Sequence, residues 1–134
     1  GPTAGAIVKP SDREPAKRIV FIQCVGSRDR RWNPWCSGIC CMISLKHAML
    51  VKSANPDTDI SVCYIDIRTT GREHEYYYEK AREMGIKFVK GRPTEILHDP
   101  DGNVLVIESF KCKVCGKVCQ SYRELLEEHL KKHR

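Results

Sequence analysis

The stretch Arg18-Ile19-Val20-Phe21-Ile22-Gln23-Cys24 decides the fold, because it concentrates β-branched and aromatic residues with few polar breaks. Such a run is typical of a strand that is buried on both faces, as in a parallel sheet. A polar, turn-rich segment follows at residues 25–36. Apolar residues then recur at helical spacing over residues 37–53, and Asn55-Pro56 ends the predicted helix.

The alternation of strand and helix continues along the chain. Residues 60–67 predict a second strand, residues 73–84 a second helix that ends at Gly85, and residues 86–90 a third strand. The order βαβαβ predicts an α/β fold, a Rossmann-like parallel sheet with right-handed crossovers.

Beyond the third strand the pattern changes. Residues 95–97 and 104–107 flank Asp99-Pro100-Asp101-Gly102-Asn103, which predicts a β-hairpin. Residues 110–134 resemble a separate small unit. We therefore expect two domains, a Rossmann-like domain over residues 1–109 and a small ββα-type domain over residues 110–134.

Composition and charge narrow the class of protein. The 134 residues include 41% hydrophobic and 30% charged residues, with a net charge of +6, which favours acidic partners without choosing among them. No apolar run reaches the roughly 18 residues that a membrane span needs, and the N-terminus lacks secretory-signal features. A cytoplasmic protein is expected, and in a reducing compartment clustered cysteines are typically metal ligands.

Four cysteines occur in one stretch of 18 residues, from the end of the first predicted strand to the start of the first predicted helix. Cys24 ends the strand, at the sheet edge where open α/β sheets bind ligands, and Cys36, Cys40 and Cys41 lie at the start of the helix. Cys36 and Cys40 share one helical face if the helix begins that early. Cys41 points about 100° away from Cys40, so one ligand needs non-helical backbone, which Gly38 supplies.

Four thiolates suit either zinc or an iron–sulfur cluster. Adjacent cysteines are awkward for one small ion and reach two irons of a larger cluster more easily. The helix N-terminus and Arg28, Arg30 and Arg31 offset the negative charge of such a cluster. The alternative is that some of these cysteines are small buried hydrophobic residues. Trp32 and Trp35 either shield the site or form an interface patch.

The N-terminal sequence resembles the A subunit of heterodisulfide reductase over about the first 110 residues. The resemblance is carried by Phe21-Ile22-Gln23-Cys24-Val25-Gly26-Ser27-Arg28-Asp29, Asn33-Pro34-Trp35-Cys36-Ser37, Cys40-Cys41-Met42, Tyr64-Ile65-Asp66-Ile67-Arg68 and Phe88-Val89-Lys90-Gly91-Arg92-Pro93. It implies that Cys24, Cys36, Cys40 and Cys41 ligate a [4Fe–4S] cluster, since the matching cysteines of that family hold one cluster of a larger flavoprotein.

The departures from the family are informative. The chain has no G-x-G-x-x-G after a strand and no ferredoxin run of C-x₂-C-x₂-C-x₃-C, and it is far shorter than the proteins of that family. FAD binding is therefore not carried over. Electron transfer between redox protein partners is still expected without FAD, whereas flavin-based bifurcation is not.

The C-terminal residues resemble a C₂H₂ zinc finger. Cys112, Cys115, His129 and His133 give C-x₂-C-x₁₃-H-x₃-H, and the two histidines share one face of a predicted helix. Two sulfurs and two nitrogens form a preferred tetrahedral zinc environment. Three acidic residues on that helix repel phosphate, which favours a structural or protein-docking role over DNA recognition.

Two functions remain open on the sequence. The first is an electron-transfer module, at most one component of an oxidoreductase complex, that carries a [4Fe–4S] cluster and passes electrons between redox partners. The second is a binding or regulatory module whose finger contacts nucleic acid or protein and whose four-cysteine site is structural. A zinc-only protein is a third reading, which metal analysis distinguishes.

Overall fold

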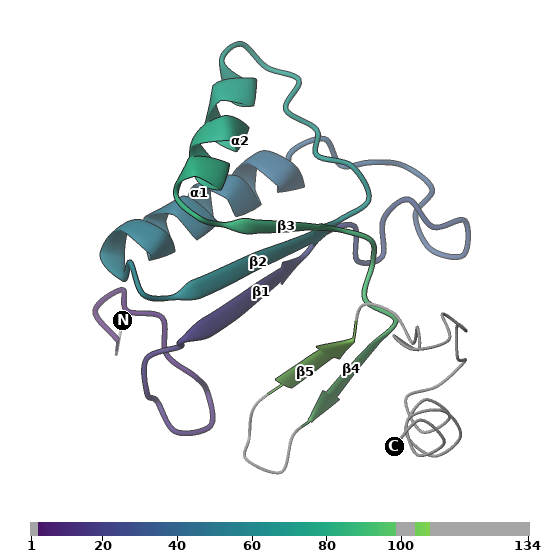
Figure 1. The fold of residues 1–134 in the computed structure, drawn as a ribbon. Helices are drawn as coiled ribbons and strands as arrows, with labels where there is room; N and C mark the ends of the chain where they lie inside the picture. Colours follow the sequence, from purple (N-terminus) through teal and green to yellow (C-terminus); the bar gives the residue numbers. More distant parts are fainter. Residues whose placement is uncertain (1–2, 99–103, 108–134) are drawn as a thin grey trace, which may run out of the picture. The chain divides into compact units, whose positions relative to one another are not determined.

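The computed structural model describes residues 3–98 and 104–107 (Figure 1). β1 (Arg18–Ile22) is followed by α1 (Cys40–Ala54), β2 (Asp59–Tyr64), α2 (His74–Glu83) and β3 (Lys87–Lys90). The three strands form one parallel sheet in the order β1-β2-β3. The predicted βαβαβ order and parallel pairing are therefore confirmed.

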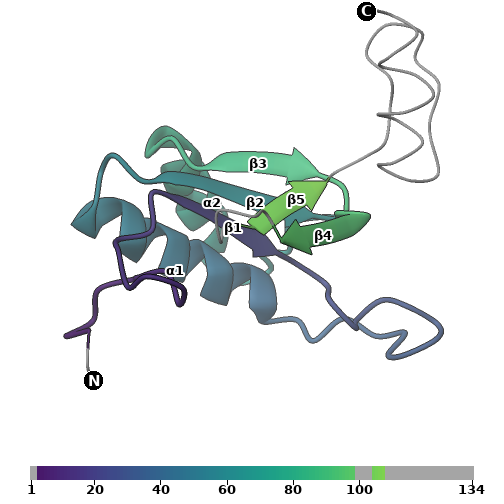
Figure 2. The same cartoon turned by 90° about the horizontal axis from the view of Figure 1, so that it is seen from below.

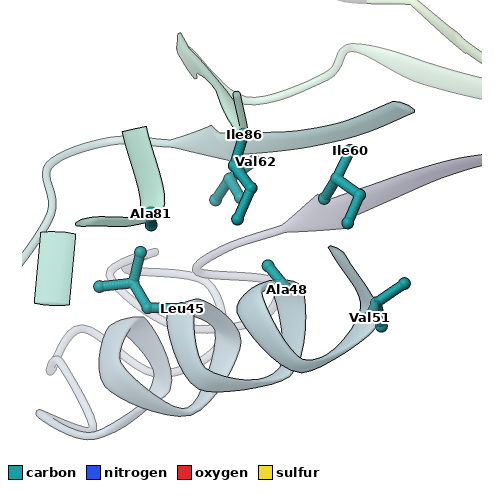
Figure 3. Packing of buried hydrophobic residues seen from close by; sticks show 7 residues of the cluster. All are labelled: Leu45, Ala48, Val51, Ile60, Val62, Ala81 and Ile86. Carbon is teal, nitrogen blue, oxygen red and sulfur yellow. The ribbon is translucent and has the colours of Figure 1, made fainter. Parts of the chain in front are cut away.

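The core lies between β2 and the two helices. β2 is the central strand, and its Ile60 and Val62 side chains are 0% and 1% exposed. Figure 3 shows both of them pointing toward residues of α1, with Ala81 of α2 beside them. Both helices thus pack on the same face of the sheet. The full cluster of buried residues is Leu45, Ala48, Val51, Ile60, Val62, Ala81 and Ile86.

β1 departs from the expectation of burial on both faces. Its residues alternate in exposure, and Val20 remains 40% exposed. The reason is topological, because β1 is an edge strand and its Ile19 and Phe21 already reach the helical core. The continuous apolar run of residues 18–24 therefore predicted more burial than this strand has.

Both helices of the described residues contribute to the core, although α2 buries only Ala81. α1 buries Cys41, Leu45, Ala48 and Val51, which recur at spacings of four and three as a core-facing stripe requires. No helix among residues 3–98 has the length and apolar character needed to cross a bilayer.

The predicted hairpin is also present. β4 (Glu95–His98) pairs with β5 (Val104–Ile107) in antiparallel register. The chain divides into two compact units, residues 1–92 and 93–134, and the hairpin belongs to the second. The domain boundary expected near residue 110, and the finger beyond it, lie outside the described residues and stay predictions.

Candidate metal centre

The cysteine segment, residues 24–39, connects the end of β1 to the start of α1. In Figures 1 and 2 it projects from the end of the sheet to which β1 points. Cys24 lies two residues after β1, and Cys40 and Cys41 are the first two residues of α1. The segment thus brings residues 16 positions apart to the same end of the α/β layer.

The helix begins later than the sequence pattern predicts. It starts at Cys40, not Ser37, because Gly38 takes a backbone φ of +79°, which a right-handed helix does not allow. Cys36 therefore lies outside the helix, and the early helix start that would place Cys36 and Cys40 on one helical face does not occur. The expectation that Gly38 supplies non-helical backbone is confirmed.

Left-handed backbone is concentrated in the cysteine segment. Cys24 has a φ of +60° and Arg28 a φ of +58°, although neither is glycine. Non-glycine residues in this region cost on the order of 1–3 kcal/mol each and cluster at functional sites. The conformation lets the chain reverse, so that the amide of Arg28 donates to the carbonyl of Trp35 at 3.4 Å, next to Cys36.

The core stripe of α1 decides where the adjacent thiols point. Cys41 is the first member of that stripe and is 8% exposed, with its Sγ 3.8 Å from the backbone oxygen of Asp66. Cys40 precedes it by one residue, about 100° around the helix. Its side chain is exposed, and its Sγ lies 2.6 Å from the Ser37 hydroxyl.

Two of the other thiols affect the Cys24 thiol electrostatically. Burial raises the pKa of the Cys24 thiol, the Arg28 guanidinium opposes that increase, and the nearby Cys41 and Cys36 thiols raise the pKa further. The Cys36 sulfur also accepts a hydrogen bond from the Gly38 amide at 3.3 Å. Cys41 and Cys36 therefore both lie near enough to Cys24 to affect its pKa, while the Cys40 sulfur lies beside the Ser37 hydroxyl.

Arg28 connects the thiols to the end of β2. Its guanidinium pairs with the Asp66 carboxylate and also interacts with the Cys24 thiol. Arg68 adds a second pair to Asp66, with 3.6 Å between Nε and Oδ2. The sequence pattern indicated a neutralising charge at Arg28 but no role for Asp66. The available signal was the position of Asp66 just after a parallel strand, at the edge where Cys24 also lies.

A second acidic residue, Asp29, lies next to Arg28 and connects the cysteine segment to the end of β3. Asp29 accepts from Arg31 at 2.9 Å and lies 3.9 Å from Arg92, which follows β3. The hydrogen bond from the Arg31 side chain is the main reason that the pKa of Asp29 is lowered to about 2. Asp29 therefore stays ionised at neutral pH, and ion pairs tie the cysteine segment to the ends of both β2 and β3.

The four cysteine thiols are suitable ligands for a sulfur-bound metal centre, but they are not gathered around one point as the ligands of a single ion are. Within residues 3–98 and 104–107, no three His, Cys, Asp or Glu side chains group as the ligands of one metal ion do. Among the four cysteines, the adjacent Cys40 and Cys41 project about 100° apart around α1. Ile39, at the N-terminal end of α1, makes no side-chain cap, and the first turn contains no acidic residue to compete for its amides.

The two tryptophans of the cysteine segment do not cover the thiols. Trp32 and Trp35 are 77% and 76% exposed, so little of either ring is packed against the protein. The sequence left two interpretations, a shield for the site or an interface patch. The high exposure of both rings does not support the shield. Cys63, by contrast, is 2% exposed within β2 and lies in the protein interior.

The zinc ligands expected at Cys112, Cys115, His129 and His133 lie outside the described residues. The zinc site therefore stays a prediction of the sequence.

These features define a small α/β domain with a cysteine-rich segment at the carboxyl end of its sheet, and the proteins similar to it are A subunits of heterodisulfide reductases. No family model matches the chain. Over 111 residues, 81% of the chain, it is 48% identical to an iron-sulfur A subunit of the CoB–CoM heterodisulfide reductase of Methanopyrus kandleri. Over 109 residues, 80% of the chain, it is 47% identical to the A subunit of the H(2)/formate:CoB-CoM heterodisulfide,ferredoxin reductase of Methanococcus maripaludis.

A third relative is the A subunit of the Ferredoxin/F(420)H(2)-dependent CoB-CoM heterodisulfide reductase of Methanosarcina acetivorans, 47% identical over 79% of the chain. The resemblance inferred from the motifs is thus confirmed for about four fifths of the chain. The chain spans 17% of the length of the first two relatives and 14% of the third. It is similar to one segment of a redox-complex component.

Proposed function

We propose that the chain is an iron–sulfur electron-transfer module of a heterodisulfide-reductase-like redox complex, with a [4Fe–4S] cluster on Cys24, Cys36, Cys40 and Cys41. The observation that carries the proposal is that the chain returns Cys40 and Cys41, the first residues of α1, to the end of the parallel sheet where Cys24 follows β1. Cys40 completes the set, because it is exposed at the first residue of α1 and a rotation about its Cα–Cβ bond redirects its sulfur.

The arrangement of the thiols favours a cluster over zinc. One ion needs all four sulfurs within about 2.3 Å of a single point, which adjacent helical residues with side chains about 100° apart do not provide easily. A four-iron cluster takes one thiolate per iron, so its ligands approach from different directions. The relative from Methanopyrus kandleri is named an iron-sulfur protein, which supports the same choice.

A bound [4Fe–4S] cluster supplies one-electron transfer, accepting an electron from a donor and passing it to an acceptor. The protein holds the sulfurs, balances their charge and limits water at one side. Cys41 is buried, and the Arg28 guanidinium and the uncapped amides of α1 provide positive potential. Positive potential of this kind stabilises the more negatively charged, reduced state of a cluster.

The proposed redox partners of this chain are suggested by the names of its relatives. Those names include heterodisulfide, ferredoxin and F(420)H(2) as substrates of whole complexes. We infer that this module exchanges electrons with another protein of such a complex. FAD is not assigned, since no dinucleotide fingerprint is present in the sequence.

The C-terminal C-x₂-C-x₁₃-H-x₃-H motif is proposed to bind one Zn²⁺ through Cys112, Cys115, His129 and His133. Its role is structural or protein docking. So short a unit buries little apolar surface, and the metal therefore supplies most of its stability.

The test is anaerobic reconstitution with iron and sulfide, followed by iron and sulfide counts and visible absorbance. Wild-type protein is expected to hold about four irons and four sulfides per chain, the composition of the cluster. Cys40→Ser is expected to lose most of the cluster absorbance, because a serine hydroxyl is a poor ligand for iron. Cys63→Ala is the matched control, since Cys63 is buried in β2 and is not in the proposed ligand set.

Two results contradict the proposal. One is a wild-type protein that takes up zinc but neither iron nor sulfide at this site. The other is a Cys40→Ser protein whose absorbance and iron content equal those of Cys63→Ala.

A further inference from the structure

We infer that the cysteine segment is the docking surface for an acidic electron-carrier protein, with Trp32 and Trp35 as its apolar anchors and the exposed Arg30 and Arg31, which precede Trp32 in the chain, as its charged residues. The inference rests on the proposed function, because it assigns the surface through which the same site meets its redox partner.

Exposed apolar side chains are concentrated beside the candidate metal centre. Val25, Trp32 and Trp35 are 76%, 77% and 76% exposed, and Ile39 is 61% exposed. All four lie within residues 24–39, between the first and the last of the four cysteines. No other large apolar side chain of the described residues is as exposed as the first three. Clustered exposure of this kind marks interaction sites, and tryptophan is enriched among residues that dominate binding energy.

The segment is held in shape, which suits it for binding. A backbone bridge joins Ser27 to Asn33, and the Asp29 amide donates to the Asn33 carbonyl at 3.0 Å. The ion pairs of Asp29 with Arg31 and Arg92 add side-chain anchors. A loop that is already shaped loses less conformational entropy on association. The two indoles are therefore presented by structured backbone.

Charge selects an acidic partner. Within the cysteine segment Arg28 pairs with Asp66 and Arg31 pairs with Asp29, and Arg30 adds a third positive charge. Arg30 is exposed, and the Arg31 side chain is 81% exposed although it pairs with Asp29. Exposed arginines close in the chain to apolar anchors complement a partner surface that carries carboxylates beside an apolar patch, and they accelerate encounter at low salt.

Position makes this surface useful for electron transfer. The anchors Trp32 and Trp35 lie in the same loop as Cys36, and the Arg28 amide bonds to the Trp35 carbonyl. Figures 1 and 2 show the loop standing clear of α1, α2 and the three-stranded sheet. Trp35 is the residue before the candidate ligand Cys36, so a protein bound to the tryptophans would lie close to the proposed ligands. A short distance between redox centres favours electron transfer.

The experiment measures binding of a small acidic ferredoxin, used as the probe, to the full chain after cluster reconstitution, by calorimetry at two salt concentrations. Trp32→Ala combined with Trp35→Ala is expected to weaken binding by about tenfold or more. Arg30→Glu is expected to weaken binding and to reduce its salt dependence. Leu50→Ala, which alters a 58% exposed side chain on α1, is the matched control and should bind as wild type does.

Three results would contradict docking of an acidic electron carrier on the cysteine segment. Equal ferredoxin binding by wild type and by both loop variants overturns the docking surface, as does a cluster-bearing wild type that binds no ferredoxin. A wild-type dimer in sedimentation that the tryptophan variant makes monomeric assigns the surface to a second copy and also overturns the inference.

Iron and sulfide counts on each variant separate loss of docking from loss of the cluster. If the tryptophan variant loses iron, Arg30→Glu alone carries the test. A wild type without iron or sulfide contradicts the proposed function instead.

Discussion

Arg28 acts on two groups of the candidate metal centre at once. Its guanidinium pairs with the Asp66 carboxylate and lowers the pKa of the Cys24 thiol against the effect of burial. Because arginine stays protonated at any ordinary pH, it contributes a permanent positive charge. The left-handed backbone of Arg28 itself, with a φ of +58°, is part of what aims this side chain.

Removing that charge should change the redox behaviour of the site. Arg28→Gln is expected to shift the cluster's reduction potential to a more negative value, because the reduced state loses a stabilising positive charge. A redox titration followed by electron paramagnetic resonance measures the shift. Arg28→Lys should recover much of the potential, since it keeps the charge.

Arg30→Gln is the control for this prediction, because it removes the same charge from an exposed residue of the same segment. Its potential should move less than that of Arg28→Gln, since solvent screens exposed charges. Equal shifts for the two variants would show that Arg28 acts only through overall charge.

At the scale of the elements, α1 has two tasks that depend on one helical register. The stripe Leu45, Ala48 and Val51 packs against β2, and the same stripe turns Cys41 inward and leaves Cys40 exposed. The position of both thiols is therefore a consequence of core packing. The cysteine segment is also anchored by ion pairs at the ends of β2 and β3, through Asp66 and Arg92.

Leu45→Ala should destabilise the α/β unit strongly. Leu45 is 1% exposed at the centre of the core, and truncation of such a side chain typically costs about 2–5 kcal/mol of unfolding free energy. Urea denaturation followed by circular dichroism gives the value. Leu50→Ala lies on the same helix at 58% exposure and should change stability by about 0.5 kcal/mol or less. Similar losses for both variants would mean that α1 does not pack as the structure has it.

At the scale of the whole molecule, the chain separates into two compact units, residues 1–92 and 93–134. All four proposed cluster ligands belong to the first unit, and all four proposed zinc ligands belong to the second. The two metals are therefore expected to bind independently.

A fragment of residues 1–92 should retain about four irons and four sulfides after reconstitution but bind no zinc, whereas the full chain should bind one zinc in addition. Elemental analysis of both proteins measures this directly. Zinc in the fragment, displacing iron, would indicate that the four-cysteine site prefers a single ion. A full chain without zinc would contradict the finger.

The amino-acid sequence determined the elements and their order. The apolar runs of residues 18–24 and 60–67 and the helical spacing after residue 37 are local patterns, and short strand–helix–strand connections lead to parallel pairing. The hairpin at β4 and β5 was predictable for the same reason, since its turn residues are adjacent in the chain. The spacing of the cysteines likewise identified the candidate ligands, because clustered thiols are a property of the sequence itself.

Only the tertiary structure decided how those ligands are presented. The positive φ of Cys24 and Arg28 has no local sequence signature, because it depends on the chain reversing between β1 and α1. Which of the adjacent thiols faces inward depends on the register of α1 against β2, and the role of Asp66 depends on strands brought together from distant positions. Backbone periodicity is a local property, whereas side-chain direction at a site results from packing between distant segments.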